Sequence, residues 1–151
     1  MKEIRLTQGR VTFVDDDDYE YLNQFKWHYT NGAAGRDIGT GKRKKRLKMH
    51  RIINNTPDGF DTDHINRNQL DNRRSNLRTA THSQNGHNRP VQKNNKIGVK
   101  GVSWSKQNKK WYAQLHVRGK YVFRGHYDTI ESAKRAYDNA LEAYVGEYAY
   151  H

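Results

Sequence analysis

The sequence predicts an α+β protein built from two units, and three observations lead there. Hydrophobic residues make up only 33% of the 151 residues, which favours two small cores over one large core. Several short segments alternate between apolar and polar residues, as strands do, whereas one long segment repeats its apolar residues at helical spacing. The three Trp, ten Tyr and four Phe are too many for a chain that is simply disordered.

The first part of the chain predicts a hairpin, a short helix and a strand. Residues 4–15 alternate around a central Gln-Gly turn, which predicts two paired strands. Four consecutive Asp at 15–18 precede apolar residues at helical spacing, so a short helix with acids at its N-terminus is expected. Metal binding by these four Asp is the alternative. A strand is expected at 26–30, and residues 31–48 are expected to be a flexible turn followed by a basic run.

The middle of the chain predicts a helix and then a linker. A short amphipathic segment is expected at 49–55, and the sequence Thr81-His-Ser-Gln84 is a capping box that starts a helix near His82. Residues 89–96 are polar and basic and contain a Pro, so they are expected to link a domain at 1–88 to a second domain at 97–151.

The second domain is expected to be a three-stranded antiparallel sheet packed on one helix. Residues 111–117 alternate, and similar strands precede and follow them across short turns. From Thr129 the apolar residues recur at steps of three and four until Gly146 ends the run, which predicts one amphipathic helix.

The charge is concentrated in two blocks. The formal net charge is +12, and residues 41–96 carry +10 while residues 97–127 carry +7 with no acidic residue. Such a cation favours a polyanionic partner, most often nucleic acid. Phosphate contacts are expected from the basic run Lys42, Arg43, Lys44, Lys45 and Arg46. No apolar run is long enough for a membrane helix, and the absence of Cys excludes disulfides and Cys-ligated zinc.

An Asp-His pair at Asp63 and His64 offers the chemistry of phosphodiester hydrolysis. That reaction needs an activated water and a cation on the phosphate. His64 can act as a general base near neutral pH, and Asp63 offers a hard oxygen ligand for a divalent cation such as Mg²⁺. Because neighbours on a regular strand point to opposite faces, the pair is expected at a strand end or a bulge.

One polar stretch, residues 63–85, contains the Asp-His pair, an Asn-Leu at 76–77 and a Gln-Asn at 84–85. This stretch resembles the HNH endonuclease motif of phage and intron homing enzymes, and the MHRII at 49–53 also matches. The resemblance implies a ββα-metal fold in which the Asp-His pair ends one strand, Asn-Leu opens a second strand, and a helix follows. It implies Asp63 and Asn85 as metal ligands, His64 as the catalytic base and Asn76 as the residue that pins the loop.

Three arginines of this stretch are also expected to contact DNA: Arg67, Arg73 and Arg74. Arg67 departs from the family, which often has Gly at this loop position. Two histidines have open roles. A structural or phosphate-facing role is favoured over metal ligation for His50, and His82 is expected on the surface near the helix start.

The C-terminal stretch contains the motifs KGV at 100–102, GHYDT at 125–129 and GE at 146–147. With these motifs it resembles the plant apetala/ethylene-response-factor DNA-binding domain. That domain also occurs in phage homing endonucleases. That family lays its three-stranded sheet in the major groove. The resemblance implies DNA contacts from Lys100, Ser103, Lys106, Gln114, His116, Tyr121 and Phe123. Ser103, His116 and Tyr121 stand where the family has Arg, so bidentate readout of guanine is expected to be weaker.

The sequence therefore predicts a metal-dependent DNA endonuclease of the homing type that acts at a preferred site. One divalent cation is expected per site, Mg²⁺ with Mn²⁺ as the alternative. The partner is double-stranded DNA and not a membrane, and the protein is expected to be a monomer or weak dimer in the cytoplasm, of a bacterial host if phage-encoded. The alternatives are a non-catalytic DNA-binding protein with a decayed HNH fold and an RNA-binding protein.

Overall fold

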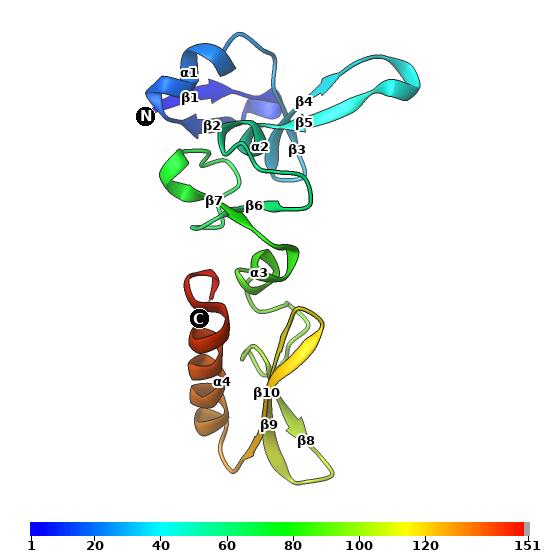
Figure 1. The fold of residues 1–151 in the computed structure, drawn as a ribbon, viewed down its shortest axis with the longest axis vertical. Helices are drawn as coiled ribbons and strands as arrows, with labels where there is room; N and C mark the ends of the chain where they lie inside the picture. Colours follow the sequence, from blue (N-terminus) through cyan, green and yellow to red (C-terminus); the bar gives the residue numbers. More distant parts are fainter. Residues whose placement is uncertain (150–151) are drawn as a thin grey trace. The chain divides into compact units, whose positions relative to one another are not determined.

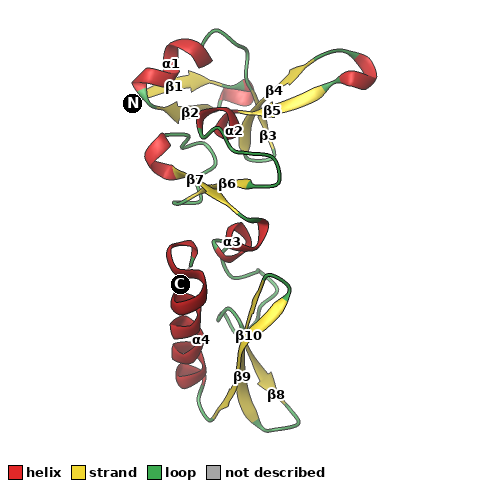
Figure 2. Cartoon of the chain, viewed as in Figure 1, coloured by secondary structure: helices red, strands yellow, loops and turns green. Residues whose placement is uncertain are grey.

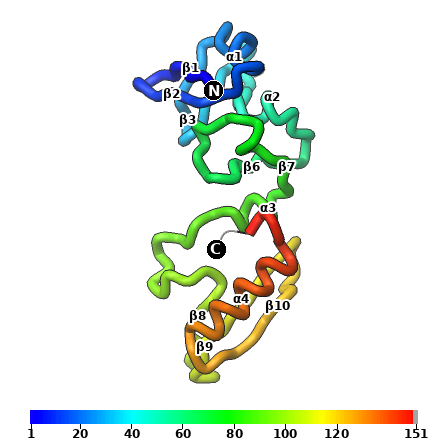
Figure 3. Tube along the Cα trace, turned by 90° about the vertical axis from the view of Figure 1, so that its left-hand side faces the viewer, coloured from blue at the N-terminus to red at the C-terminus, as the bar shows by residue number. Residues whose placement is uncertain are grey.

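The computed structural model describes residues 1–149, and within them several small sheets accompany a few helices, so the architecture is mixed α and β. The chain divides into two compact units, one from Met1 to His82 and one that starts at Ser83. Each unit has its own apolar core, as the low hydrophobic content predicts. Figure 3 traces the chain from the blue N-terminus through the first unit and on to the red α4 of the second. No helix among residues 1–149 is long and apolar enough to cross a membrane.

The first unit opens with the expected hairpin and helix. β1 (Lys2–Arg5) pairs antiparallel with β2 (Val11–Val14), and Gln8 in the turn between them has a φ of 63°. α1 (Asp16–Leu22) follows, with acids in its first turn, where they complement the helix dipole. The N-terminal amine reaches back to this turn and pairs with Asp16 at 2.7 Å.

A three-stranded sheet comes next, and it corrects one expectation. β3 (His28–Thr30), β4 (Ala33–Ile38) and β5 (Lys45–Lys48) pair antiparallel in that order, so the flexible turn expected after residue 30 is wrong over the span of β4. The Ala-Ala-Gly start of β4 carries a weak strand signal by itself. Packing decides here, because all three of these small residues are buried.

The hairpin of β4 and β5 extends from the rest of the first unit, as Figure 1 shows, and we call residues 33–48 the basic arm. Asp37 on β4 lies opposite Arg46 on β5 and accepts hydrogen bonds from its Nε at 2.7 Å and Nη2 at 3.1 Å. Lys44 adds an ion pair to Asp37 at 3.0 Å. These contacts hold the pKa of Asp37 well below its usual range, and the hydrogen bond from Arg46 has the largest effect. The pairing stabilises the register of the arm.

The last elements of the first unit lead into a helix. α2 (Met49–Ile53) precedes β6 (Asp61–His64), which pairs antiparallel with β7 (Leu77–Ala80) across a long loop, and α3 (His82–His87) follows. This strand–strand–helix order is the one that the resemblance to HNH enzymes implies. The core of the first unit consists of buried apolar residues: Ile4, Leu6, Val14, Leu22, Trp27, Ala34, Met49, Ile53 and Leu77.

The second unit is an antiparallel sheet with one long helix beside it (Figure 2). β9 (Lys110–Val117) lies between β8 (Val102–Ser105) and β10 (Lys120–Tyr127). α4 (Ile130–Val145) packs against β9 and β10, and Thr129 caps its first turn by accepting a hydrogen bond from the Ser132 amide. Its core consists of buried residues from the sheet and the helix: Val102, Ala113, Leu115, Ala133, Tyr137, Ala140 and Leu141.

Gly101 allows this helix to approach the sheet. Its φ is +69°, and a Cβ built on it would overlap the ring of Tyr137 on α4. A side chain at residue 101 would therefore be strained twice, by the backbone conformation and by the close approach of the ring.

A bulge in β10 changes which side chains face outward. The pairing with β9 shifts between Tyr121 and Phe123, so Tyr121 lies opposite His116 while Phe123 lies opposite Leu115. Phe123 is therefore partly buried and packs against the core, so its expected DNA contact stays a prediction. Arg124, which simple alternation assigns to the core face, takes the exposed face instead.

Candidate active site

The Asp-His pair lies at the carboxyl end of β6. His64 is the last residue of the strand. Neighbouring side chains on a regular strand point to opposite faces, so Asp63 and His64 can serve one site only where the strand ends or bulges. Both residues are nearly inaccessible, with exposed fractions of 4% for Asp63 and 5% for His64. Buried polar groups of this kind need defined partners, and the surrounding residues supply them.

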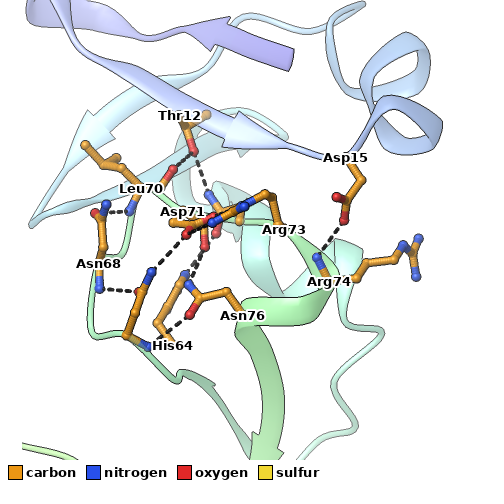
Figure 4. Close-up of polar contacts among 11 residues, drawn as sticks. Thr12, Asp15, His64, Asn68, Leu70, Asp71, Arg73, Arg74 and Asn76 are labelled. Atoms are coloured by element: carbon orange, nitrogen blue, oxygen red, sulfur yellow. Dashed lines mark hydrogen bonds and ion pairs between the residues drawn. The ribbon is translucent and has the colours of Figure 1, made fainter. Parts of the chain in front are cut away.

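The side chain of Asn76 forms hydrogen bonds within the loop at 65–76. The amide of Asn66 donates to Asn76 Oδ1 at 2.9 Å, and Asn76 Nδ2 donates to the carbonyl of Asp71 at 2.7 Å. The backbone of Asn76 also accepts a hydrogen bond from the amide of Ile65 at 2.9 Å. Figure 4 shows Asn76 beside His64 within this network. One buried side chain thus joins the start of the loop to its end.

Arg73 and Arg74 are engaged in ion pairs of the first unit. Arg73 binds both carboxylate oxygens of Asp71 at 2.7 Å, and this contact lowers the pKa of Asp71. Arg74 binds Asp18 of α1 at 2.6 and 2.8 Å, while its amide donates to Asp15. The acids of α1 thus anchor the loop, a role that the sequence did not suggest. Figure 4 draws both arginines and shows the hydrogen bond from the Arg74 amide to Asp15.

Arg67 has a left-handed backbone. Its φ is 64°, and its amide donates to the carbonyl of His64 at 2.8 Å. This conformation is natural for Gly and strained for Arg, which explains why a Gly at this position suits related loops. The exposed side chain of Arg67 lies three residues from the candidate base.

His64 is oriented by Asn72, a residue that the sequence analysis missed. His64 Nε2 lies 3.0 Å from Asn72 Oδ1, and Asn72 Nδ2 donates to Thr12 Oγ1 at 2.8 Å. Burial lowers the pKa of His64, and this effect outweighs the opposing effects of Asn72 and the nearby carboxylates. The ring is therefore neutral at neutral pH, as a general base must be.

Asp63 has a cross-strand partner that was also missed. Arg78 lies opposite Asp63 in the β6–β7 register, and its Nη2 is 2.7 Å from Asp63 Oδ2. The sequence alone does not indicate this pair, because it depends on the register of β6 and β7. That register in turn depends on the loop between the two strands.

His50 is buried against the candidate base. Its ring meets that of His64 edge to face, with centroids 5.1 Å apart. The pKa of His50 is lowered to about 3. Burial is the largest cause, and positive charge on His64, Lys48 and Arg51 adds to it. Its Nδ1 has no hydrogen-bond partner among residues 1–149. The structure favours the packing role over the phosphate-facing one, because the ring is not exposed.

The expected second ligand, Asn85, lies on α3, the helix that follows β7. His82 at the start of that helix is exposed, as expected, and its Nδ1 is 3.1 Å from Asp61 Oδ2. No cluster of three or more His, Cys, Asp or Glu side chains suited to a metal occurs in residues 1–149. The carboxylate of Asp63, in the first unit, and the side-chain amide of Asn85, in the second unit, are each an oxygen ligand of the type that Mg²⁺ accepts.

Two exposed surfaces carry the other predicted contacts. In the basic arm, all five residues from Lys42 to Arg46 are exposed, although Asp37 pairs with two of them. In the second unit, the open face of the sheet holds Ser103, Tyr112, Gln114, His116, Tyr121, Arg124 and His126. Two pairs of rings are in contact on this face: His116 meets Tyr121 edge to face at 5.0 Å, and Tyr112 meets His126 at a tilt at 4.8 Å between centroids.

Lys106 lies exposed in the turn after β8, but Lys100 has a different role from the one expected. Lys100 is half-buried, and its Nζ donates to the carbonyl oxygens of His87 at 2.6 Å and Arg89 at 2.9 Å. Burial lowers its pKa. Lys100 therefore holds the backbone at residues 87–89, and we leave it out of the open face of the sheet.

Comparisons with known proteins found one family model and two relatives. The model of the HNH endonuclease family matches residues 55–87, which include Asp63, His64, Asn76 and Asn85. An uncharacterized HNH endonuclease of Acanthamoeba polyphaga mimivirus is 29% identical over 148 residues, 94% of this chain and 74% of that protein. Protein 3.8 of Escherichia phage T7 is 35% identical over 94 residues, 62% of this chain and 76% of that protein. No solved structure matches significantly.

Proposed function

We propose, from the premise that this chain carries an HNH endonuclease domain and belongs to one family with Protein 3.8 of Escherichia phage T7, that it cuts DNA with the site around Asp63 and His64. The family indicates a nuclease with DNA as its substrate. The finer proposal is a homing-type endonuclease that hydrolyses phosphodiester bonds at a preferred site. A phage relative is consistent with action in a bacterial host.

The observation that carries this proposal is the pair of buried polar residues at the end of β6, held by a pinned loop. Burying an imidazole and a carboxylate, with exposed fractions of 5% and 4%, is costly in a small polar unit, and such burial of neighbouring titratable residues is typical of catalytic sites. The loop bonds of Asn76 fix the backbone on both sides of the site. Such pre-organisation is what a catalytic site requires.

In the proposed reaction, His64 takes a proton from a water molecule, whose oxygen forms a bond to phosphorus. The bond from phosphorus to the leaving sugar oxygen breaks, and that oxygen takes a proton from solvent. Asp63 and Asn85 would hold a divalent cation, Mg²⁺ or Mn²⁺, which supplies charge stabilisation on the phosphate when it is bound. Asn76 keeps the loop and the base in place, and Arg67 contributes a cation beside the base.

We also propose that DNA binds the two exposed surfaces, the basic arm and the open face of the second sheet. The two-stranded basic arm has the width that fits a major groove, and its lysines can neutralise phosphates. The open face of the second sheet belongs to a segment with seven basic and no acidic residues, at 97–127. Its aromatic rings and Arg124 offer contacts to bases as well as to the DNA backbone. We propose that this sheet provides site preference.

The test is cleavage of supercoiled plasmid by the full-length protein in Mg²⁺, Mn²⁺ or EDTA. We expect nicked circles with either cation and intact plasmid with EDTA, because one HNH site per chain cuts one strand at a time. If duplex DNA is bound but never cut with any divalent cation, the protein is the non-catalytic DNA-binding alternative. Stronger competition by single-stranded RNA than by duplex DNA would assign it to the RNA-binding class instead.

A further inference from the structure

A buried chain of hydrogen bonds reaches His64 from a strand that is distant in sequence. Thr12 lies on β2 and Asn72 lies in the loop after β6, and both have an exposed fraction of 0%. The chain runs from Leu70 O to Thr12 Oγ1 at 2.8 Å, from Thr12 Oγ1 to Asn72 Nδ2 at 2.8 Å, and from Asn72 Oδ1 to His64 Nε2 at 3.0 Å. Figure 4 shows Thr12 above the loop, with a dashed line to Leu70.

The donor and acceptor roles along this series of hydrogen bonds are fixed at the Leu70 end. The carbonyl of Leu70 can only accept, so the Thr12 hydroxyl donates its single proton there. The lone pairs of that hydroxyl then accept from an N–H, which requires the nitrogen of the Asn72 amide to face Thr12.

A second contact supports this orientation of the amide. Met49 Sδ lies 3.7 Å from the same Asn72 nitrogen, and a thioether sulfur can accept a hydrogen bond but cannot donate one. Two acceptors therefore flank the amide nitrogen, and Asn72 Oδ1 is left to face His64. An oxygen at that point can only accept, so His64 Nε2 must carry a proton.

We propose that Thr12 and Asn72 are positioning residues that hold His64 in its Nε2–H tautomer, so that Nδ1 carries the lone pair that takes the proton from water. The inference rests on the proposed function, in which His64 is the general base. Neither Thr12 nor Asn72 touches the reacting atoms. They act through His64, by fixing both the tautomer and the orientation of the ring.

A structural role alone would make different predictions. If the two residues served only to satisfy buried polar groups, their loss would lower stability but leave the tautomer of His64 and the rate of the folded enzyme unchanged. Partners that orient a reacting or ligating histidine typically contribute about 10- to 100-fold to activity or affinity. A selective effect on kcat, with KM unchanged, therefore separates the two roles.

The first measurement is the ¹⁵N spectrum of His64 in the full-length protein, with no metal and no DNA, at a pH where the ring is neutral. We expect the chemical shifts of a protonated Nε2 and an unprotonated Nδ1. The resonances are assigned with His64→Gln. The reverse pattern in the wild-type protein overturns the proposal, whatever the protein does to DNA.

The second measurement uses Thr12→Val, which keeps the shape of the side chain and removes the hydroxyl, with Thr12→Ser as the matched control. We expect mixed tautomers and a kcat lower by about 10-fold or more for the valine variant, and wild-type behaviour for the serine variant. An unchanged tautomer and kcat in Thr12→Val would overturn the proposal. If the valine variant does not fold, Met49→Leu removes the sulfur acceptor and is expected to shift the tautomer in the same direction, to a smaller extent.

The two levels of inference fail separately. A wild-type protein with the expected tautomer that cuts no DNA under any condition contradicts the nuclease function and leaves the hydrogen-bond chain intact. An active nuclease with the opposite tautomer contradicts the chain and leaves the nuclease function intact.

Discussion

Asp63 and Arg78 face each other across β6 and β7: Asp63 Oδ2 accepts a hydrogen bond from Arg78 Nε at 2.8 Å and forms an ion pair with Arg78 Nη2 at 2.7 Å. The pair is almost completely removed from solvent. A buried carboxylate needs such a cation, and a divalent metal at the same carboxylate would provide a second one. This relationship connects the stability of the first unit to the proposed metal site.

The first prediction follows from that pair. Arg78→Met should destabilise the protein by about 3–5 kcal/mol in EDTA, because it leaves a buried carboxylate without its cation. Mg²⁺ should restore part of the loss if Asp63 is a metal ligand, and Arg78→Lys should be milder. Urea unfolding with and without Mg²⁺ measures both effects. Equal losses in the two conditions would contradict the role of Asp63 as a ligand.

The second prediction concerns the base. His64→Ala should lower the cleavage rate by about 10²–10⁴-fold, which is the usual contribution of a general base, while DNA affinity stays within a few-fold. His28→Ala, a change on β3 at a histidine with no role in the proposed reaction, serves as the control and should cut normally. Gel shifts and plasmid nicking measure binding and rate separately. Undiminished cleavage by His64→Ala would remove the assignment of the base.

The third prediction uses the pKa of about 3 for buried His50, against an ordinary value of 6.5. Below pH 6.5 the unfolded chain binds a proton at His50 that the folded chain does not bind until pH falls to about 3. The free energy of unfolding should therefore be unaffected by this group above pH 6.5 and fall with pH below it, by at most about 1.4 kcal/mol per pH unit.

His50→Phe should flatten this dependence, since phenylalanine fills a similar volume and does not titrate. Buried His64 contributes in the same direction, so part of the slope should remain. Denaturant unfolding at pH 7, 6 and 5 provides the comparison. An identical slope in the wild type and the variant would show that His50 is not the titrating group.

The fourth prediction concerns the left-handed residue of the loop. Arg67→Gly removes the strain of a positive φ but adds backbone entropy to the unfolded chain, so stability should change by less than about 1 kcal/mol. DNA affinity should nevertheless fall, and its salt slope should decrease by about 0.9 for the phosphate contact that is lost. Arg67→Lys should retain most of the affinity. If Arg67→Gly changes neither the DNA affinity nor the salt slope, Arg67 shapes the loop and does not contact DNA.

The fifth prediction contrasts two neighbours on β10. Phe123→Ala should destabilise the second unit by about 2 kcal/mol or more, because the ring packs against its core. Arg124→Ala should leave stability unchanged and weaken duplex binding, with a smaller salt slope. Thermal unfolding and gel shifts at several salt concentrations test the pair. The opposite assignment of effects would mean that the bulge does not place these side chains as described.

Much of the fold was predictable from local patterns. The helix from Ile130 to Val145 and the strands before it follow from apolar spacing, which reports which face of an element is buried. β4 was missed because its small residues gain their preference for a strand only from packing in the sheet. The bulge at β10 was missed because one extra residue reverses the alternation after it, and no local pattern marks it.

The sequence by itself determined the chemistry that is available to this protein: a carboxylate beside an imidazole, an Asn that can pin a loop, and two blocks of positive charge. Only the tertiary structure decided which groups complete the site. Arg78 reaches Asp63 through strand register, and Thr12 reaches Asn72 across 60 positions of the chain. Such contacts depend on how separate elements pack together, and a hydrogen bond between distant residues has no periodic signature in the sequence.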